Sequence, residues 1–301
     1  MSRAIVLSGG GAVGIAWQTG LVAGLSAEGV DVSKADFVVG TSAGSAVGAQ
    51  IALGRDMSTA LERFARPATA SAPRPAAPRQ GAASGSPERL QNLFAIMAKA
   101  MAEDGDPAKA RAALGRYALE AKTVTEEQFL LGFGYLADER WPRAFSCTAV
   151  DAESGQFMVW NEASGVDLVR AVGSSCAVPG LFPPITLGGR RYMDGGMRSG
   201  TNADLAKGHD RVLILTLMGT SAAGAADGES NPRLERMRRS RERELSVLRD
   251  SGASIESVGP DAEAAAIMGM DLMNPALTHD AAQAGLRQGR AEAERLRAFW
   301  S

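Results

Sequence analysis

Cysteine and histidine are scarce in this chain, which contains two residues of each among 301. The cysteines, Cys147 and Cys176, stand in apolar surroundings, so we expect them to be free, buried thiols in a reducing compartment. They form no cluster with metal-ligand spacing, and we expect neither a metal nor another cofactor. The two histidines leave few candidates for the base that usually activates a catalytic serine.

A strong excess of charge of one sign is also missing. Lysine and arginine number 32 against 34 aspartate and glutamate residues, and the net charge of -2 argues against a general nucleic-acid binder. No apolar run is long enough to span a bilayer, and the apolar run at residues 4–7 is too short for a signal peptide. We therefore expect a soluble, cytoplasmic protein without a nucleic-acid partner.

Two strand-like segments near the start of the chain each end in a glycine-rich turn and lead into a helical pattern. Residues 4–7 form the first apolar run, and residues 37–39 form the second, which stops at Gly40. Strand, glycine turn and helix, twice in succession, predict an α/β fold with a parallel sheet. The length allows one large domain, with or without an inserted lobe.

The second turn has the pattern of a nucleophile elbow, Gly40-x-Ser42-x-Gly44. Such a turn is sharp and strained, and side chains at its shoulders would collide, so glycine is expected on either side of Ser42. Ser42 would then expose its hydroxyl above the positive end of the following helix. The pattern by itself is a common accident in a chain with 35 glycines, but the flanking strand and helix favour catalysis.

The first turn allows three interpretations. Gly9, Gly11 and Gly14 satisfy the dinucleotide pattern G-x-G-x-x-G, but no acidic residue ends the second strand to hold a ribose. Successive glycine N–H groups at a helix start can instead hold negative charge, as an oxyanion hole requires. A plain tight turn for close helix packing is the third interpretation. Considered together with Ser42, the turn is best interpreted as an oxyanion loop.

The chain resembles the patatin-like phospholipase family in three motifs, Gly9-Gly10-Gly11-x-x-Gly14, Gly40-x-Ser42-x-Gly44 and Asp194-Gly195-Gly196. Residues 177–184 are similar to a Pro-x-x-Phe-Pro-Pro segment of such proteins. The resemblance implies a three-layer α/β/α fold with a mostly parallel central sheet and a helical cap region, in a single domain over residues 1–301. It also implies a lipid acyl hydrolase of the phospholipase A, lysophospholipase or esterase type, with a lipid or acyl ester as substrate and transient contact with a membrane surface.

The resemblance assigns a catalytic dyad to Ser42 and Asp194 and an oxyanion hole to Gly9, Gly10 and Gly11. Residues 185–187 and 190–193 predict a hairpin that delivers Asp194 at its end, where a carboxylate can accept the serine proton directly. An aspartate in water has a pKa of about 3.9 and is a weak base, so it serves only in a dry site. The plain alternative is that Asp-Gly-Gly forms only a hairpin turn.

Two other hypotheses stay open. His209 and His279 follow Ser42 and Asp194 in the Ser…Asp…His order of an α/β-hydrolase triad, although neither carries a motif. Alternatively, the chain is a catalytically silent lipid- or nucleotide-binding module that keeps the glycine loop as an anion cradle. The chain also departs from the family at Val13, where Arg or Lys is usual, and this leaves the preference for phosphate head groups open.

The composition changes abruptly at residues 67–87, which are rich in Ala, Pro, Ser, Gly and Arg. This stretch predicts a loop, either a lid over an acyl pocket or an inert insertion. Residues 88–138 predict a helical, cap-like insertion, with a capping box at Thr125 and Gln128. Residues 233–248 predict a charged helix, whose interleaved Glu and Arg favour a solvated face over contact with anionic lipids.

Overall fold

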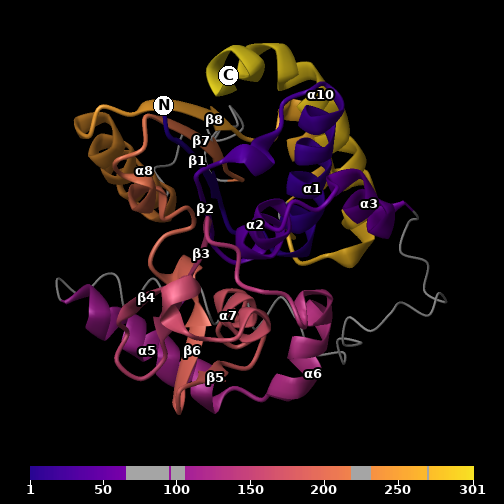
Figure 1. Cartoon of the computed structure of the whole chain (residues 1–301). Coiled ribbons are helices and arrows are strands. Elements are labelled where there is room, and N and C mark those ends of the chain that lie inside the picture. Colours follow the sequence, from indigo (N-terminus) through magenta and orange to yellow (C-terminus); the bar gives the residue numbers. More distant parts are fainter. Residues whose placement is uncertain (66–94, 96–105, 218–231, 270) are drawn as a thin grey trace. The chain divides into compact units, whose positions relative to one another are not determined.

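The computed structural model of the chain describes residues 1–65, 95, 106–217, 232–269 and 271–301 (Figure 1). The chain forms two compact units. The first unit comprises Met1–Ala72, Pro142–Phe145 and Ser199–Ser301, and the second unit comprises Pro73–Trp141 and Ser146–Arg198. The loop predicted at residues 67–87 lies outside the described residues. The same is true of residues 88–94 and 96–105 of the cap predicted at residues 88–138. A single domain over residues 1–301 stays a prediction.

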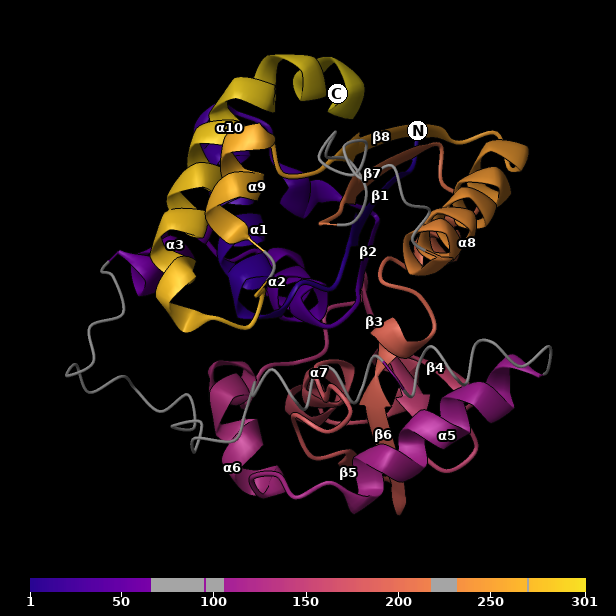
Figure 2. The ribbon, with the colours of Figure 1, turned by 180° about the vertical axis from the view of Figure 1, so that it is seen from behind.

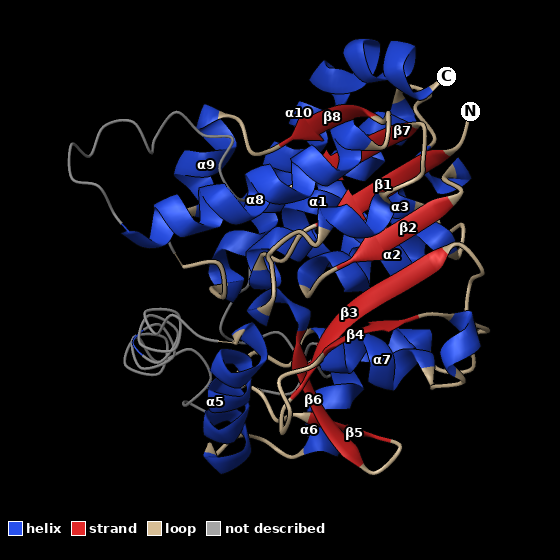
Figure 3. Ribbon diagram, turned by 90° about the vertical axis from the view of Figure 1, so that its left-hand side faces the viewer, coloured by secondary structure: helices blue, strands red, loops and turns tan. Residues whose placement is uncertain are grey.

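Four parallel strands form the sheet of the first unit, in the order β2-β1-β7-β8 (Figure 3). Leu7, the last residue of β1, pairs with Gly40 on one side and with Leu215 on the other, so three carboxyl ends lie level. The parallel sheet predicted from the sequence is thus confirmed in this unit. The strands are β1 (Arg3–Leu7), β2 (Phe37–Gly40), β7 (Arg211–Leu215) and β8 (Ser254–Val258).

Helices cover both faces of this sheet, which makes the first unit a three-layer α/β/α structure. Its helices are α1 (Gly11–Ala27), α2 (Ala43–Ala52), α3 (Met57–Leu61), α8 (Pro232–Asp250), α9 (Ala262–Met268) and α10 (Thr278–Trp300), with a short 3-10 helix η6 (Ala203–Ala206). Ala4 and Val6 of β1 share a buried cluster with Leu248 of α8 on one face. On the other face, Leu7 lies against α2 at Gly44. Figures 1 and 2 show α1 and α10 on the same side of the strands as α2.

Helix α10 packs along α1 through small residues on both helices. A Cβ added at Gly20 of α1 would lie 2.0 Å from Ala282 O, and one added at Gly285 of α10 would lie 2.2 Å from Trp17 O. The two backbones are therefore in direct contact, with no room for side chains between them. This contact fixes α1, the helix that follows the glycine turn.

The strands within the second unit are antiparallel. β3 pairs with β4 and β6, and β6 pairs with β5. The predicted hairpin across Gly188 and Gly189 is confirmed, and both glycines have positive φ, of 56° and 77°. Short hairpin turns impose antiparallel pairing, whereas the helical crossovers of the first unit impose parallel pairing. The strands are β3 (Phe145–Asp151), β4 (Phe157–Trp160), β5 (Ile185–Leu187) and β6 (Arg190–Asp194).

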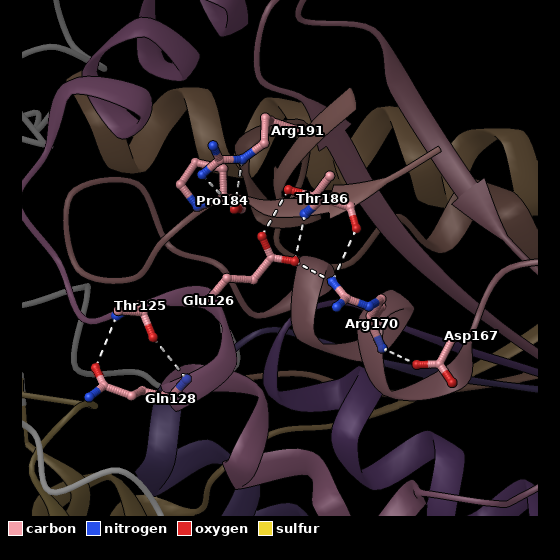
Figure 4. Close-up of polar contacts among 8 residues, drawn as sticks. All are labelled: Thr125, Glu126, Gln128, Asp167, Arg170, Pro184, Thr186 and Arg191. Atoms are coloured by element: carbon pink, nitrogen blue, oxygen red, sulfur yellow. Dashed lines mark hydrogen bonds and ion pairs between the residues drawn. The ribbon is translucent and has the colours of Figure 1, made fainter. Parts of the chain in front are cut away.

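Helices of the second unit include α5 (Pro107–Glu120), α6 (Glu126–Leu130), the 3-10 helix η3 (Leu131–Leu136) and α7 (Leu168–Ser175). The predicted capping box at the start of α6 is confirmed (Figure 4). Gln128 N–H donates to Thr125 Oγ1 over 3.2 Å, and Thr125 N–H donates to Gln128 Oε1 over 3.1 Å. The described part of residues 88–138 is therefore mainly helical, as the sequence predicts.

One carboxylate covers the edge of β5 (Figure 4). Glu126 accepts hydrogen bonds from Thr186 N–H at 3.0 Å and from the Thr186 hydroxyl at 2.8 Å. Arg170 donates to the same carboxylate and to Thr186 O, the latter over 3.3 Å. The edge strand thus has backbone groups satisfied by side chains, which blocks pairing with a further strand.

The surface of the molecule includes a strongly charged helix. The charged helix predicted at residues 233–248 is confirmed as α8, and its Arg249 and Glu242 form an ion pair at 2.6 Å with both side chains more than half exposed. That pair is what a solvated face would carry. Of the helices in the described ranges, none is both long and apolar enough to cross a membrane.

Candidate active site

Strands β1 and β2 end side by side, and each end leads through a turn into a helix. The pairing of Leu7 with Gly40 places the glycine turn after β1 next to the elbow after β2. A Cβ added at Gly9 would lie 3.4 Å from Ser42 Cβ, which is ordinary van der Waals contact. The structure therefore brings Ser42 and Gly9 together, as expected for two turns at the carboxyl edge of a parallel sheet.

The turn at Ser42 has the strained geometry of a nucleophile elbow. Ser42 has φ 52° and ψ -120°, a backbone conformation that few residues other than glycine adopt. A Cβ added at Gly40 would lie 2.4 Å from Gly44 O, and one added at Gly44 would lie 2.1 Å from Leu7 O. Both glycines are thus required by close backbone approach, which confirms the collision predicted at the shoulders of the turn.

Ser42 is also the N-cap residue of α2, directly before its first residue. Its carbonyl accepts hydrogen bonds from Ser45 N–H at 2.8 Å and from Ser45 Oγ at 2.7 Å. The first turn of α2 contains no acidic residue, so no side chain of that turn offsets the positive end of the helix dipole. Ser42 is 8% exposed. A negative charge that develops on or next to Ser42 is stabilised by this position.

Two N–H groups in the glycine turn are already bonded. Gly9 N–H donates to Gly200 O over 2.9 Å, and Val13 N–H donates to Leu272 O over 3.0 Å. The sequence predicts Gly9 as one of three oxyanion donors, but its N–H group is committed to Gly200. Its contribution is therefore to shape the turn.

The N–H groups between these two, those of Gly10, Gly11 and Ala12, lie at the start of α1. The described residues supply no acceptor to these three N–H groups. The first N–H groups of a helix have no partner within the helix and carry its positive end. This run of consecutive amides can therefore bind an anion, as the oxyanion interpretation requires.

Two apolar side chains without any sequence motif pack on the glycine turn. A Cβ added at Gly10 would lie 2.7 Å from Leu217 Cδ2, and one added at Gly11 would lie 2.6 Å from Met273 Sδ. Both side chains come from segments far from the turn in sequence, so no local pattern points to them. Both residues are half-buried, and their apolar groups lie directly against the turn. Apolar surroundings strengthen the attraction between amides and an anion.

Val13 is completely buried, at 0% exposed. A lysine or arginine at this point would have to reach solvent or a partner, because an unpaired buried charge is strongly unfavourable. Val13 contributes no charge to the glycine turn. The positive potential that this stretch offers an anion therefore comes from the backbone amides at the start of α1.

Asp194 lies at the end of β6 in the second unit, where the sequence predicts it. Its N–H donates to Ala177 O over 3.0 Å, and its Oδ1 accepts from Gly196 N–H over 2.7 Å. Asp194 is 2% exposed. These bonds fix both the backbone and the carboxylate of Asp194.

Gly195, which follows Asp194, lies where a side chain would clash with a neighbouring strand. A Cβ added at Gly195 would lie 2.1 Å from Thr148 Oγ1 and 2.6 Å from Thr148 O. The chain therefore passes directly over β3 as it leaves Asp194, and a side chain here would push it away. Ser42 and the glycine turn belong to the first unit and Asp194 to the second, so the pairing of Ser42 with Asp194 stays a prediction.

The two histidines have other partners. His209 stacks on Phe37 with ring centroids 5.3 Å apart, and Phe37 begins β2 whereas Ser42 follows its end. The four residues of β2 extend over roughly 13 Å. His209, stacked at the start of this strand, is therefore beyond direct hydrogen-bond reach of Ser42, which follows its end. His279 Nδ1 lies 2.6 Å from Phe64 O. These contacts give the Ser-Asp-His hypothesis no support.

The cysteines are buried thiols, as predicted. Burial raises the pKa of the Cys147 thiol well above its usual value, and the nearby Cys176 adds to the shift. A thiol in that state is a poor nucleophile and a poor metal ligand. Within the described ranges, no group of three or more His, Cys, Asp or Glu residues is placed to hold a metal ion.

The sequence matches the model of one protein family, described as patatin-like phospholipase, over residues 5–207. The match covers more than half of the chain, so the chain belongs to the patatin-like phospholipase family, as its three motifs predict. Membership implies lipid acyl hydrolase activity. No protein of curated function matches the sequence significantly.

Similar solved structures include VipD from Legionella pneumophila, with 14% identity and a TM-score of 0.44, covering 98% of this chain and 67% of VipD. The type III effector ExoU has 17% identity and a TM-score of 0.40, over 98% of this chain and 53% of ExoU. Full-length ExoU from Pseudomonas aeruginosa, in complex with full-length SpcU, has 16% identity and a TM-score of 0.40, over 100% of this chain and 53% of that one. The chain thus spans about half the length of ExoU.

Proposed function

We propose that the chain is a serine acyl-ester hydrolase in which Ser42 attacks the ester of a lipid and Asp194 takes and returns the proton. The observation that carries the proposal is the strained elbow at Ser42 beside a turn with uncommitted amides. A strained backbone that holds a serine at a helix start has no packing purpose of its own, and such strain is typical of functional sites.

The amides of Gly10 and Gly11 are the proposed oxyanion donors, and Gly9 shapes the turn that presents them. When Ser42 Oγ bonds to the carbonyl carbon, the carbonyl oxygen becomes negative and needs donors that are already oriented. The start of α1 offers such donors next to Ser42, and the apolar side chains of Leu217 and Met273 pack against the turn. Collapse of the tetrahedral intermediate expels the alcohol and leaves an acyl-enzyme, which water then hydrolyses to release the fatty acid.

Asp194 is the proposed general base. Its carboxylate is held in one rotamer by Gly196 N–H and is almost completely buried, so water does not compete for the proton. Asp194 lies only six positions before Gly200, whose carbonyl accepts a hydrogen bond from Gly9 N–H beside Ser42. Six residues span at most roughly 20 Å, so the chain itself keeps Asp194 tethered to the nucleophile region.

The substrate class in this proposal is a lipid acyl ester, presented at a surface that the protein contacts transiently. The family supports this class, and Leu217 and Met273 offer apolar contact to an acyl chain next to the reacting carbonyl. A cytoplasmic location is part of the same proposal, supported by two thiols that form no disulfide within the structure described.

The test is turnover of a neutral p-nitrophenyl ester and of a lysophospholipid by Ser42→Ala and Asp194→Asn. Each change should lower kcat by more than about 10³-fold, because both residues act in the same chemical step. Asn keeps the acceptor for Gly196 N–H, so Asp194→Asn should leave the thermal stability almost unchanged.

His209→Ala and His279→Ala are the matched controls and should keep turnover. Activity in Asp194→Asn together with its loss in either histidine variant would replace the dyad with a triad. Saturable nucleotide binding without any ester turnover by the wild type would instead support a silent binding module.

A further inference from the structure

A short stretch after Asp194, residues 199–202, contacts both turns at the carboxyl edge of the first unit; we call it the bridging segment. At the glycine turn, Gly200 O accepts from Gly9 N–H over 2.9 Å. At the elbow, Asn202 Nδ2 donates to Thr41 Oγ1 over 2.9 Å, one residue before the nucleophile. One segment therefore contacts the source of the nucleophile and the source of the oxyanion donors.

Asn202 is held in an uncommon conformation. Its φ of 52° and ψ of 37° are left-handed, and it is completely buried. Its Nδ2 also donates to Ser199 O over 2.8 Å, and its backbone N–H donates to Ser199 Oγ over 3.3 Å. Asparagine tolerates left-handed backbone better than most residues, but a turn alone needs no amide that reaches a second element.

The bridging segment is anchored on its other side by Glu244 of α8, which is 6% exposed. One carboxylate oxygen, Oε2, accepts from Thr201 Oγ1 over 2.6 Å and from Ala203 N–H over 2.9 Å. A single oxygen that accepts from two donors of neighbouring residues holds both of them in place. The segment is thus fixed to a helix of the sheet's other face and cannot simply move with either turn.

We infer that Asn202 is a positioning residue that sets the distance between the Ser42 hydroxyl and the oxyanion donors, acting through Thr41. The inference rests on the proposed function. Nucleophile and donors come from two different turns, and an error of about 1 Å between them can slow a reaction by roughly 10²-fold. The bridging segment is suited to prevent that error, because Gly200 binds the glycine turn, Asn202 binds the elbow, and Thr201 between them binds α8.

The test is a double-mutant cycle with Asn202→Gly and Thr41→Val. Glycine adopts the left-handed conformation without strain, so Asn202→Gly removes the amide and leaves the backbone preference intact. Valine matches threonine in shape but cannot accept the hydrogen bond. Each change should lower kcat on the neutral p-nitrophenyl ester by about 10- to 100-fold, with KM within about twofold. The double variant should lose no more than the worse single variant, because both changes break the same bond.

Two controls separate positioning from folding. Asp138→Gly replaces another non-glycine residue with positive φ, of 63°, and should leave kcat unchanged. Thr41→Ser keeps the hydroxyl and should keep most of the activity that Thr41→Val loses. If Asn202→Gly proves unstable, Thr41→Val and Thr41→Ser carry the test alone.

Additive losses in the double variant, or full kcat in both single variants, would overturn the inference while leaving the Ser42 chemistry standing. A wild-type protein without any ester turnover would remove the proposed function and, with it, the role given to Asn202.

Discussion

The turn that carries Ser42 and the strand end that carries Asp194 differ in what holds them. In the first unit, close backbone contact holds the turn at Ser42: Gly40 and Gly44 have no room for a side chain, and the backbone of Ser42 itself is strained. In the second unit, a side-chain hydrogen bond holds the strand end, because the Asp194 carboxylate accepts from Gly196 N–H at the end of the antiparallel β5–β6 hairpin. Ser42 is thus expected to lower the stability of its unit, and the Asp194 carboxylate to raise the stability of its own unit.

The largest expected effects in this comparison come from adding a methyl group at Gly44, in the elbow, or at Gly195, next to Asp194. Gly44→Ala should lower the free energy of unfolding by more than about 3 kcal/mol, because the new Cβ would lie 2.1 Å from the backbone atom Leu7 O. Gly195→Ala should lower the free energy of unfolding by a similar amount, but one of the atoms that its new Cβ meets belongs to the side chain of Thr148. Thr148→Ala should therefore recover part of the stability lost in Gly195→Ala.

Chemical denaturation of the single and double variants measures these changes. Gly134→Ala, where nothing lies within 4 Å of the added atom, should stay within about 0.5 kcal/mol of the wild type. If Gly44→Ala were as mild as this control, backbone contact would not be what holds the elbow.

The next effect concerns the edge of the second unit. Glu126→Ala leaves Arg170 and two polar groups of Thr186 without their carboxylate, and should lower the free energy of unfolding by about 2–3 kcal/mol. Glu127→Ala, at the exposed neighbouring position, should have little effect. Hydrogen exchange should rise in β5 and β6 and not in β1 and β2. Equal increases in all four strands would mean that the two units open together.

Ser42→Gly should stabilise the first unit. Glycine adopts the conformation of Ser42 without strain, so the free energy of unfolding should exceed that of Ser42→Ala by about 1 kcal/mol. Asp194→Ala should act in the opposite direction and lower stability by about 1 kcal/mol, since it removes the acceptor of Gly196 N–H. Thermal unfolding of the three variants decides the point, and a less stable Ser42→Gly would contradict the strain assigned to the elbow.

The smallest effect is a pH dependence in the second unit. Burial of Asp151 favours its neutral form, but hydrogen bonds from Arg190 and Ser154 outweigh burial and lower its pKa. A pKa lowered in the folded state stabilises the fold above the unfolded pKa of about 4, and this contribution disappears as the pH falls through the folded value. The stability gap between the wild type and Asp151→Asn should therefore narrow below about pH 4. A gap that stayed constant down to pH 2 would show that ionisation of Asp151 contributes nothing.

The elements that the sequence predicts well are those with a local steric or hydrogen-bonding cause. The two glycine turns, the hairpin that ends at Asp194 and the capping box at Thr125 each depend on residues within a few positions of one another. Their side chains, or the lack of them, leave a pattern in the sequence. The α/β class and the parallel strands follow from the same local signals.

The contacts that complete the glycine turn could not be predicted in this way. Leu217 and Met273 reach it from more than 200 residues away, and ordinary apolar residues carry no mark of what they will touch. The commitment of Gly9 N–H to Gly200 O is likewise a long-range backbone contact that no residue type reveals. Asn202 and Glu244 are polar residues that look like surface residues in the sequence, yet both are buried.

The most direct test of the proposed nucleophile is covalent labelling with a lipophilic fluorophosphonate, followed by intact-mass measurement and mapping of the adduct. We predict a single adduct on Ser42, none in Ser42→Ala, slower labelling in Asp194→Asn, and faster labelling of the wild type when lipid micelles are present. An unlabelled Ser42 with and without micelles, or an adduct on another residue, would contradict the assignment of Ser42 as the nucleophile.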